Sequence, residues 1–159
     1  MKIGIISDSH DNLENLNKAL TILNNKTQVL IHCGDFCAPF IMAELAKFKG
    51  DVHCVFGNTD DRFTTPKMAQ KNGINFHGDI AKLEINGKKI LVNHYPDIAR
   101  AFAFTGEYDA VFYGHNHTAK KENIKNTLLL NPGEIMGKEG KPSLAIYDTE
   151  LNEAQIITL

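Results

Sequence analysis

Short apolar runs alternate with amphipathic stretches through the first half of the chain. Residues Lys2–Ser7, Val29–Ile31 and Val52–Phe56 each predict a buried strand, because a brief run of β-forming residues ends at polar ones. Leucines recur at spacings of three and four over Asn12–Asn24, which predicts a helix with one apolar stripe. Strands therefore alternate with at least one helix, as in folds built from crossover connections.

Prolines and glycines mark two further helices. Pro39 suits a first helical position and Gly50 ends that helix. Pro66 opens another helix, which runs to about Asn72. The first half thus favours parallel strands joined by crossovers. The expected inner face of the helix after Pro39 consists of Ile41, Met42, Leu45 and Phe48.

The second half changes character. Asn86-Gly87 separates Ile80–Ile85 from Lys89–Val92 and predicts a hairpin, because both turn positions need positive φ. A helix over Ile98–Phe104 and a strand over Ala110–Tyr113 follow. Together the elements predict one α/β domain over residues 1–159 with a mixed sheet system. Closing strands are expected at Thr127–Asn131, Ser143–Tyr147 and Ala154–Thr158.

The composition excludes few classes of protein, but it indicates which partners and which cellular compartment to expect. Of the 159 residues, 43% are hydrophobic and 23% charged, which is ordinary for a globular domain. The formal net charge of −2 gives no reason to expect general affinity for nucleic acid or membranes. Cys33, Cys37 and Cys54 cannot all pair and form no Cys-x-x-Cys, so we expect reduced thiols in a cytoplasmic protein.

Metal-binding side chains follow most of the predicted strands. The set has four imidazoles, two carboxylates and one amide, and this nitrogen and oxygen chemistry suits Mn²⁺, Fe, Co²⁺, Ni²⁺ or Zn²⁺. Each short motif occurs by chance in many chains. Because ligands on several strand ends of one domain can converge, the ordered set predicts a dinuclear metal site. Its members are Asp8, His10, Asp35, Asn58, His94, His115 and His117.

The order of these motifs resembles the calcineurin-like metallophosphoesterase superfamily. More narrowly, it is similar to the small single-domain prokaryotic phosphodiesterases of that superfamily. The resemblance covers essentially the whole chain and implies a four-layer αββα sandwich, with two facing mixed β-sheets flanked by helices. The motifs that carry it are Asp8-x-His10, Gly34-Asp35, Gly57-Asn58-x-Asp60, His94 and Gly114-His115-x-His117.

The resemblance also implies a mechanism. A hydroxide bridging two divalent ions attacks phosphorus in line, with Mn²⁺ or Ni²⁺ favoured and Fe, Co²⁺ or Zn²⁺ as alternatives. Asn58, Asp60 and His94 are the implied catalytic residues. One ion is held by Asp8, His10 and His117, the other by Asn58, His94 and His115, and Asp35 bridges them.

The chain departs from the family pattern at several positions. Thr59 stands where many members have a histidine that protonates the leaving group, so weaker catalysis on poor leaving groups is expected. Tyr95 replaces a common glycine and Glu134 a common serine, and both are expected to reshape the substrate mouth. Thr59 is also one of three further candidate substrate contacts, with Asn12 and Arg62.

Those last two residues each have a second interpretation. Asn12 suits a helix cap, and Arg62 an ion pair with a nearby carboxylate. His32 either packs or orients a ligand. His53 and His77 are expected at the surface or at strand ends.

A metal-dependent phosphodiesterase acting on a small phosphate ester is the favoured function. A phosphomonoesterase or nucleotidase on the same site is the nearest alternative. A non-catalytic scaffold with the same fold is the rival from another class, but every ligand position is filled here. We expect no stable nucleic-acid partner and no membrane association. A homo-oligomer stays open: Phe102 and Phe104 either pack in the core, which is the favoured interpretation, or join an interface.

Overall fold

The computed structural model describes residues 1–159 and contains two β-sheets. The first has the strand order β11-β10-β1-β2-β3-β4. Strands β1 to β4 are mutually parallel, and β10 joins β1 in the antiparallel sense. Its strands are β1 (Lys2–Ile6), β2 (Val29–His32), β3 (Asp51–Cys54), β4 (Asn75–Phe76), β10 (Ser143–Asp148) and β11 (Glu153–Thr158).

The second sheet repeats this plan with five strands in the order β5-β6-β7-β9-β8. Its central strands β6, β7 and β9 are parallel, and the edge strands β5 and β8 pair antiparallel. Each sheet therefore has a parallel centre whose carboxyl ends share one edge. The strands are β5 (Ile80–Ile85), β6 (Lys88–Asn93), β7 (Ala110–Phe112), β8 (Lys120–Ile124) and β9 (Thr127–Asn131).

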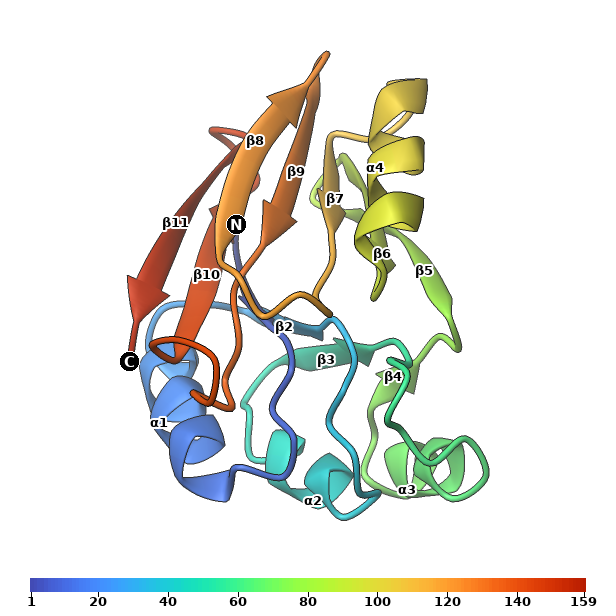
Figure 1. Ribbon diagram of the computed structural model, residues 1–159, viewed down its shortest axis with the longest axis vertical. Coiled ribbons are helices and arrows are strands. Elements are labelled where there is room, and N and C mark those ends of the chain that lie inside the picture. The colour runs from blue at the N-terminus through green and yellow to red at the C-terminus, as the bar shows by residue number, and fades with distance from the viewer.

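Helices cover the outer faces of both sheets. In Figure 1, α1 to α3 lie along the bottom of the molecule and α4 lies at the upper right. Three separate apolar clusters fill the spaces between α1–α3 and the first sheet, between the two sheets, and between the second sheet and α4. The expected four-layer α/β sandwich is confirmed. The helices are α1 (Leu13–Asn24), α2 (Ile41–Leu45), α3 (Thr65–Lys71) and α4 (Pro96–Thr105).

Strand β1 explains why the first sheet reads as continuous apolar runs. Ile3 and Ile5 face the second sheet, whereas Ile6 packs with Leu16 of α1. All three isoleucines are fully buried. A strand covered on both faces has no solvent side on which polar residues would alternate.

The hairpin prediction is confirmed in detail. Asn86 and Gly87 have φ values of 50° and 73°, as a tight turn between β5 and β6 requires. Helix α4 begins at Pro96, before the predicted start, and Gly106 ends it in the left-handed conformation.

One predicted helix is shorter in the structure, and two strands were not predicted. Helix α2 spans only Ile41–Leu45 rather than Pro39 to Gly50, although its expected inner face is buried. Strand β4 has two residues, too few for a periodic signal. Strand β8 was missed because Lys120–Asn123 are polar, as suits an edge strand that avoids further pairing. None of the four helices combines the length and the apolar character that a membrane span needs.

Candidate metal centre

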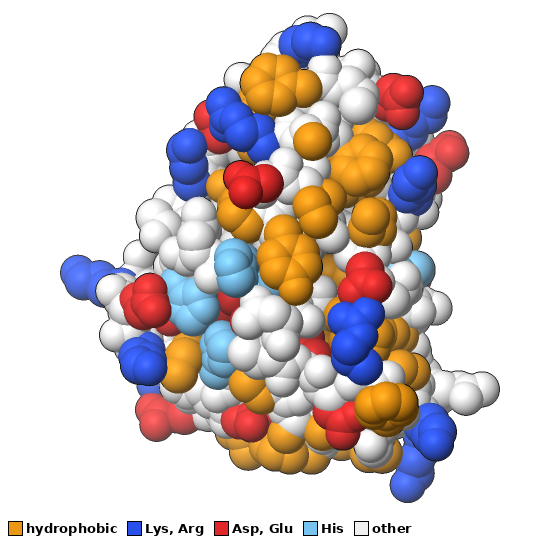
Figure 2. Space-filling view, turned by 45° about the vertical axis from the view of Figure 1, so that its right-hand side comes forward, with side chains coloured by type: hydrophobic (Ala, Val, Ile, Leu, Met, Phe, Trp, Pro, Cys, Tyr) orange, Lys and Arg blue, Asp and Glu red, His pale blue; other side chains and the backbone are white.

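The predicted ligands lie where the parallel strands of both sheets end. Loops after β1, β2 and β3 carry Asp8, Asp35 and Asn58, and loops after β6 and β7 carry His94 and His115. Carboxyl ends of parallel strands are the usual binding edge of an open sheet. Two such edges meet here, and Figure 2 shows histidine side chains gathered on this face with acidic side chains beside them.

One group consists of Asp8, His10 and His117. A ligand atom from each lies within 4.8 Å of the others. His117 Nε2 is 3.4 Å from Asp8 Oδ1, and the rings of His10 and His117 have centroids 5.2 Å apart. We refer to these three residues as the first group.

Asp35, His94 and His115 form the second group, whose ligand atoms also lie within 4.8 Å of one another. Asn58 belongs beside them, because its Oδ1 is 2.9 Å from His115 Nδ1 and 3.2 Å from His94 Nε2. The two groups therefore bring together all seven residues that the sequence singled out.

The Asp35 carboxylate lies between the groups. Its Oδ2 is 3.6 Å from His10 Nε2 in the first group and 3.4 Å from His94 Nε2 in the second. His10 Nε2 is buried without any hydrogen-bond partner, an arrangement that needs an explanation in a folded protein. An unpartnered imidazole nitrogen beside carboxylates fits a ligand for a divalent cation.

Three imidazoles are oriented from behind through Nδ1. His94 Nδ1 lies 2.8 Å from the Cys33 carbonyl oxygen, and His10 Nδ1 lies 3.2 Å from Cys37 Sγ. His117 Nδ1 lies 2.9 Å from Glu134 Oε2. Such contacts fix the ring and leave Nε2 facing the site, as is usual for histidines that bind metals.

The ligand loops are conformationally strained. Positive φ values occur at Asp8 (52°), His10 (39°), Asp35 (59°), His115 (73°) and His117 (54°). Non-glycine residues seldom adopt this region, and where they do the surrounding structure must hold them. Backbone hydrogen bonds from Asp8 to Gly34 and from His10 to Asp35 provide that support.

Two glycines allow the loops to approach closely. A Cβ atom at Gly57 would overlap the Asp35 side chain and would lie 2.5 Å from the Asp35 amide nitrogen. A Cβ atom at Gly114 would overlap Ser7 and lie 2.6 Å from Asp8 Oδ2. The glycines before Asn58 and His115 are therefore needed for space, because backbone must pass beside a ligand carboxylate.

The two ligand carboxylates differ electrostatically. Burial tends to raise the pKa of Asp35, but the His94 imidazole beside it and the hydrogen bond from the Thr59 amide outweigh burial and hold that pKa well below its usual range. Burial raises the pKa of Asp8 despite its Ser7 contact. For His94, burial is outweighed by the hydrogen bond and charge of Asp35, which raise its pKa. Asp35 is thus the carboxylate held most firmly in its ionised form.

Asp60 is directed at backbone amides rather than at open solvent. Its oxygens accept hydrogen bonds from Gly57 (2.7 Å), Cys37 (2.8 Å) and Asp35 (3.1 Å). Thr59 lies next to it, with its hydroxyl 3.3 Å from Cys37 Sγ. Asp60 therefore ties the loops after β2 and β3 together, and this placement favours positioning of Asp35 over contact with substrate.

The structure distinguishes the two interpretations of Asn12 and of Arg62. Asn12 caps α1 by accepting from the Asn15 amide at 3.1 Å, and it donates to the Met136 carbonyl. Arg62 Nη2 donates to both carboxylate oxygens of Asp79, at 2.7 and 2.8 Å, and the guanidinium lies over the Phe56 ring. Each side chain is thus occupied by protein groups.

The remaining histidines lie outside both groups. His32 is fully buried and contacts Ser9 Oγ through Nε2 at 3.0 Å, while its Nδ1 accepts from the Gly34 amide. It therefore links the loops that carry the carboxylates, and burial lowers its pKa to about 3. His53 and His77 contact each other at 2.9 Å, across β3 and the residue after β4.

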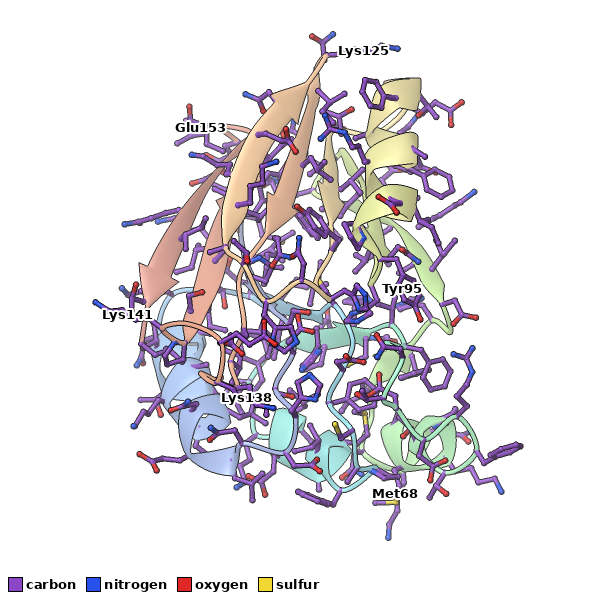
Figure 3. All side chains as sticks on the ribbon, in the orientation of Figure 1. Met68, Tyr95, Lys125, Lys138, Lys141 and Glu153 are labelled. Atoms are coloured by element: carbon purple, nitrogen blue, oxygen red, sulfur yellow. The ribbon has the colours of Figure 1, made fainter.

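Two residues behind the ligands were not predicted in these roles. Glu134 is fully buried beneath His117 instead of lining the substrate mouth, and Cys37 contacts His10. Glu134 follows β9, the third central parallel strand of its sheet, so its position after Asn131-Pro132-Gly133 was the available signal. Tyr95 does flank the site, and its ring lies edge-on to the rings of His94 and His115. It is labelled in Figure 3.

Comparison with known proteins agrees with this geometry. A phosphodiesterase of Methanocaldococcus jannaschii is 36% identical over 165 aligned positions, covering 100% of this chain and 99% of that protein. A solved archaeal phosphodiesterase superposes with a TM-score of 0.93 at 34% identity, covering both chains fully.

A more distant solved structure shares the fold alone. Wild-type Vps29 of Entamoeba histolytica, complexed with Zn²⁺, has a TM-score of 0.71 at 19% identity and covers 98% of this chain and 90% of its own. The family model described as calcineurin-like phosphoesterase superfamily domain matches residues 1–152. The chain therefore belongs to the calcineurin-like phosphoesterase superfamily.

Proposed function

We propose that this protein is a phosphodiesterase that depends on two divalent metal ions. The observation that carries the proposal is the position of the Asp35 carboxylate, within 3.6 Å of an imidazole from each ligand group. The similarity to an archaeal phosphodiesterase over the full length supports the same activity.

The residues suit two cations that share one carboxylate. Asp8, His10 and His117 would hold one ion. Divalent cations bound here would polarise a phosphoryl group and acidify water, as in other two-metal sites. Mixed nitrogen and oxygen ligation supports Mn²⁺ or Ni²⁺, with Fe, Co²⁺ and Zn²⁺ as alternatives. The second ion would be held by Asn58, His94 and His115, with Asp35 shared.

The two arginines of the chain give one reason to favour a diester over a monoester. Both arginines of the chain are engaged by carboxylates, Arg62 by Asp79 and Arg100 by Glu122. An arginine fork is the group best suited to neutralise a phosphate dianion. A diester carries one charge fewer, so it needs less neutralisation beyond that from the metals. A small phosphate ester with an accessible phosphodiester is the substrate class we propose.

Thr59 limits which diesters should react quickly. Its hydroxyl contacts the Cys37 thiol and is a poor acid near neutral pH. Substrates whose leaving groups need protonation should therefore react slowly, and Thr59→His should accelerate them more than it accelerates p-nitrophenyl esters. An equal effect on both substrate types would contradict this explanation.

A cytoplasmic location is part of the same proposal, and the state of the cysteines supports it. All three cysteines are free, and Cys37 is in contact with a ligand histidine. Reduced thiols of this kind support a cytoplasmic location.

The decisive experiment is an assay of metal-stripped protein on bis-p-nitrophenyl phosphate and p-nitrophenyl phosphate. Mn²⁺, Ni²⁺, Co²⁺, Zn²⁺ and Mg²⁺ are added back singly. We expect metal-restored hydrolysis that favours the diester and falls by about 1,000-fold in Asp35→Asn, which corresponds to ~4 kcal/mol of barrier. The carboxamide keeps the shape of the side chain while removing its charge.

Other outcomes would identify the alternatives. Preference for the monoester would indicate a phosphomonoesterase or nucleotidase on the same site. If folded, metal-loaded protein hydrolysed neither ester with any metal, the result would favour the scaffold function or a substrate that the artificial esters do not mimic.

A further inference from the structure

Glu134 is a buried carboxylate just outside the seven ligand positions. Its side chain is fully buried. It lies in the loop after β9, the central strand of the second sheet whose loop carries none of the seven ligands. A charged group is seldom buried to this extent without specific partners, because removing it from water is costly.

Both oxygens of Glu134 have partners. Oε2 lies 2.9 Å from His117 Nδ1. Oε1 accepts from the backbone amides of Glu139 at 2.7 Å and of Gly140 at 2.6 Å. The carboxylate thus connects a ligand histidine of the first group to the loop 137–141, whose Lys138 and Lys141 are labelled at the lower left of Figure 3.

His117 is backed differently from the other ligand histidines. His94 Nδ1 contacts a backbone carbonyl oxygen and His10 Nδ1 contacts a thiol, whereas His117 Nδ1 contacts a carboxylate. A carboxylate can only accept here, so it requires the proton to be on Nδ1 and leaves the Nε2 lone pair free. That Nε2 atom is the one lying 3.4 Å from Asp8. Carboxylates that hydrogen-bond ligand histidines also raise their basicity.

We propose that Glu134 is a positioning residue that holds His117 in the Nδ1–H form for metal binding and anchors the loop 137–141 beneath the site. The inference rests on the metal dependence in the proposed function, but it concerns one ligand and can be tested without measuring hydrolysis. It also assigns a role to the glutamate found where serine is common in this family.

The informative variant is Glu134→Gln, which keeps the size of the side chain. Its amide has one accepting oxygen and one donating nitrogen, so it cannot accept from His117 and from the loop amides at once. If the nitrogen faces Nδ1, the imidazole proton is driven to Nε2, the atom needed for the metal. Glu139→Gln is the matched control, because that side chain is exposed in the same loop.

The first measurement is the His117 tautomer in metal-free protein, read from two-bond ¹H–¹⁵N NMR correlations and assigned with His117→Gln. The wild type and Glu139→Gln should have the proton on Nδ1, and Glu134→Gln should shift it toward Nε2. A wild-type proton on Nε2 would overturn the proposal even if Glu134→Gln failed to fold.

The second measurement is Co²⁺ binding in competition with a chromophoric chelator. Glu134→Gln should weaken one of two Co²⁺ equivalents by about 10- to 100-fold and leave the other unchanged. Equal weakening of both equivalents with an unchanged tautomer would indicate a merely structural role and overturn the proposal. Unaltered affinity, or a wild type that binds no Co²⁺, would overturn it as well.

These results remain separate from the test of the proposed function. A wild type that binds two Co²⁺ ions but hydrolyses no ester would refute the phosphodiesterase. In that case the tautomer and the single-site affinity would still decide the role of Glu134.

Discussion

In each ligand group a carboxylate accepts from a backbone amide, Asp8 from His115 and Asp35 from Thr59, but the buried histidines are held in different ways. In the second group, His94 Nδ1 contacts the Cys33 carbonyl oxygen, so the backbone orients this imidazole. In the first group, His10 and His117 lean on the side chains of Cys37 and Glu134. Support from the backbone survives most substitutions, whereas support from a side chain depends on one residue.

The largest expected effect is a difference in lost stability between substitutions of two histidines of the second group. His94 is fully buried, so His94→Ala leaves a cavity and an unpaired Cys33 carbonyl oxygen and should destabilise metal-free protein by about 2–4 kcal/mol. His115 is exposed, and His115→Ala should change stability by no more than about 0.5 kcal/mol. Denaturant unfolding measures both, and equal losses would mean that burial does not distinguish these ligands.

Gly57→Ala should disrupt the backbone support of the second group. The added methyl meets the Asp35 side chain and amide, and relief requires the loop to move, at about 1–3 kcal/mol. We expect lost stability together with weaker binding of the metal held beside Asn58. Gly140→Ala is the control, because a Cβ there meets no atom nearer than 3.9 Å. A Gly57→Ala variant with wild-type metal affinity would show that the close approach is dispensable.

Cys37→Ala should weaken the first group more than the second. His10 loses the sulfur 3.2 Å from its Nδ1, so affinity for one metal equivalent should fall by about 10-fold with little change in unfolding free energy. Cys37→Ser keeps a donor and acceptor and should retain most of the affinity. Chelator competition would measure the difference. If alanine and serine behaved alike, the thiol would be no more than a neighbour of His10.

His53 and His77 form a pair of imidazoles outside both ligand groups, with no ligand carboxylate beside it. The pair therefore serves as a reference for the histidines of the two groups. Burial lowers the pKa of both residues, so the unfolded chain binds protons more readily. The stability associated with these two neutral imidazoles is fully present above their pKa in the unfolded chain, about 6.5. It is lost as the pH falls from there through the lowered pKa of the folded protein. Unfolding free energies from pH 8 to 5 should therefore decline less in His77→Gln than in wild type. Parallel curves would contradict this assignment.

The smallest effect concerns Arg62 beside the Asn58 loop. Its ion pair with Asp79 is largely exposed, so Arg62→Gln should cost about 0.2–1 kcal/mol of stability. We expect kcat/KM for the diester to stay within about twofold of wild type. A large rise in KM with unchanged stability would instead make Arg62 a substrate contact.

Regular packing accounts for what could be predicted from the sequence. Strands β1 and β2 are buried on both faces, so their apolar runs were clear, and the Asn86-Gly87 turn requires positive φ. Strand β8 is a charged edge, and β4 is too short to show a period. Elements whose pairing is decided by tertiary neighbours leave little local signal.

The residues of the site divide in the same way into those that could be predicted from the sequence and those that could not. The ligands stand in short motifs at strand ends, which made them visible in the sequence. Glu134 and Cys37 act through contacts with histidines that lie 17 and 27 residues away in the chain. The Arg62–Asp79 pair likewise spans 17 residues. No local pattern specifies which distant side chain will lie behind a given imidazole.

The meeting of two sheet edges has a consequence for folding. The Asp8 carboxylate accepts from the His115 amide, 107 residues later, and the first group also needs His117 after β7, so it requires strands from opposite halves of the chain. Contacts this distant in sequence form late, because loop closure must precede them. A nascent chain would lack the complete first group until β7 had been made and docked. Metal capture should therefore report on the finished fold, and a bound ion would protect against global rather than local unfolding.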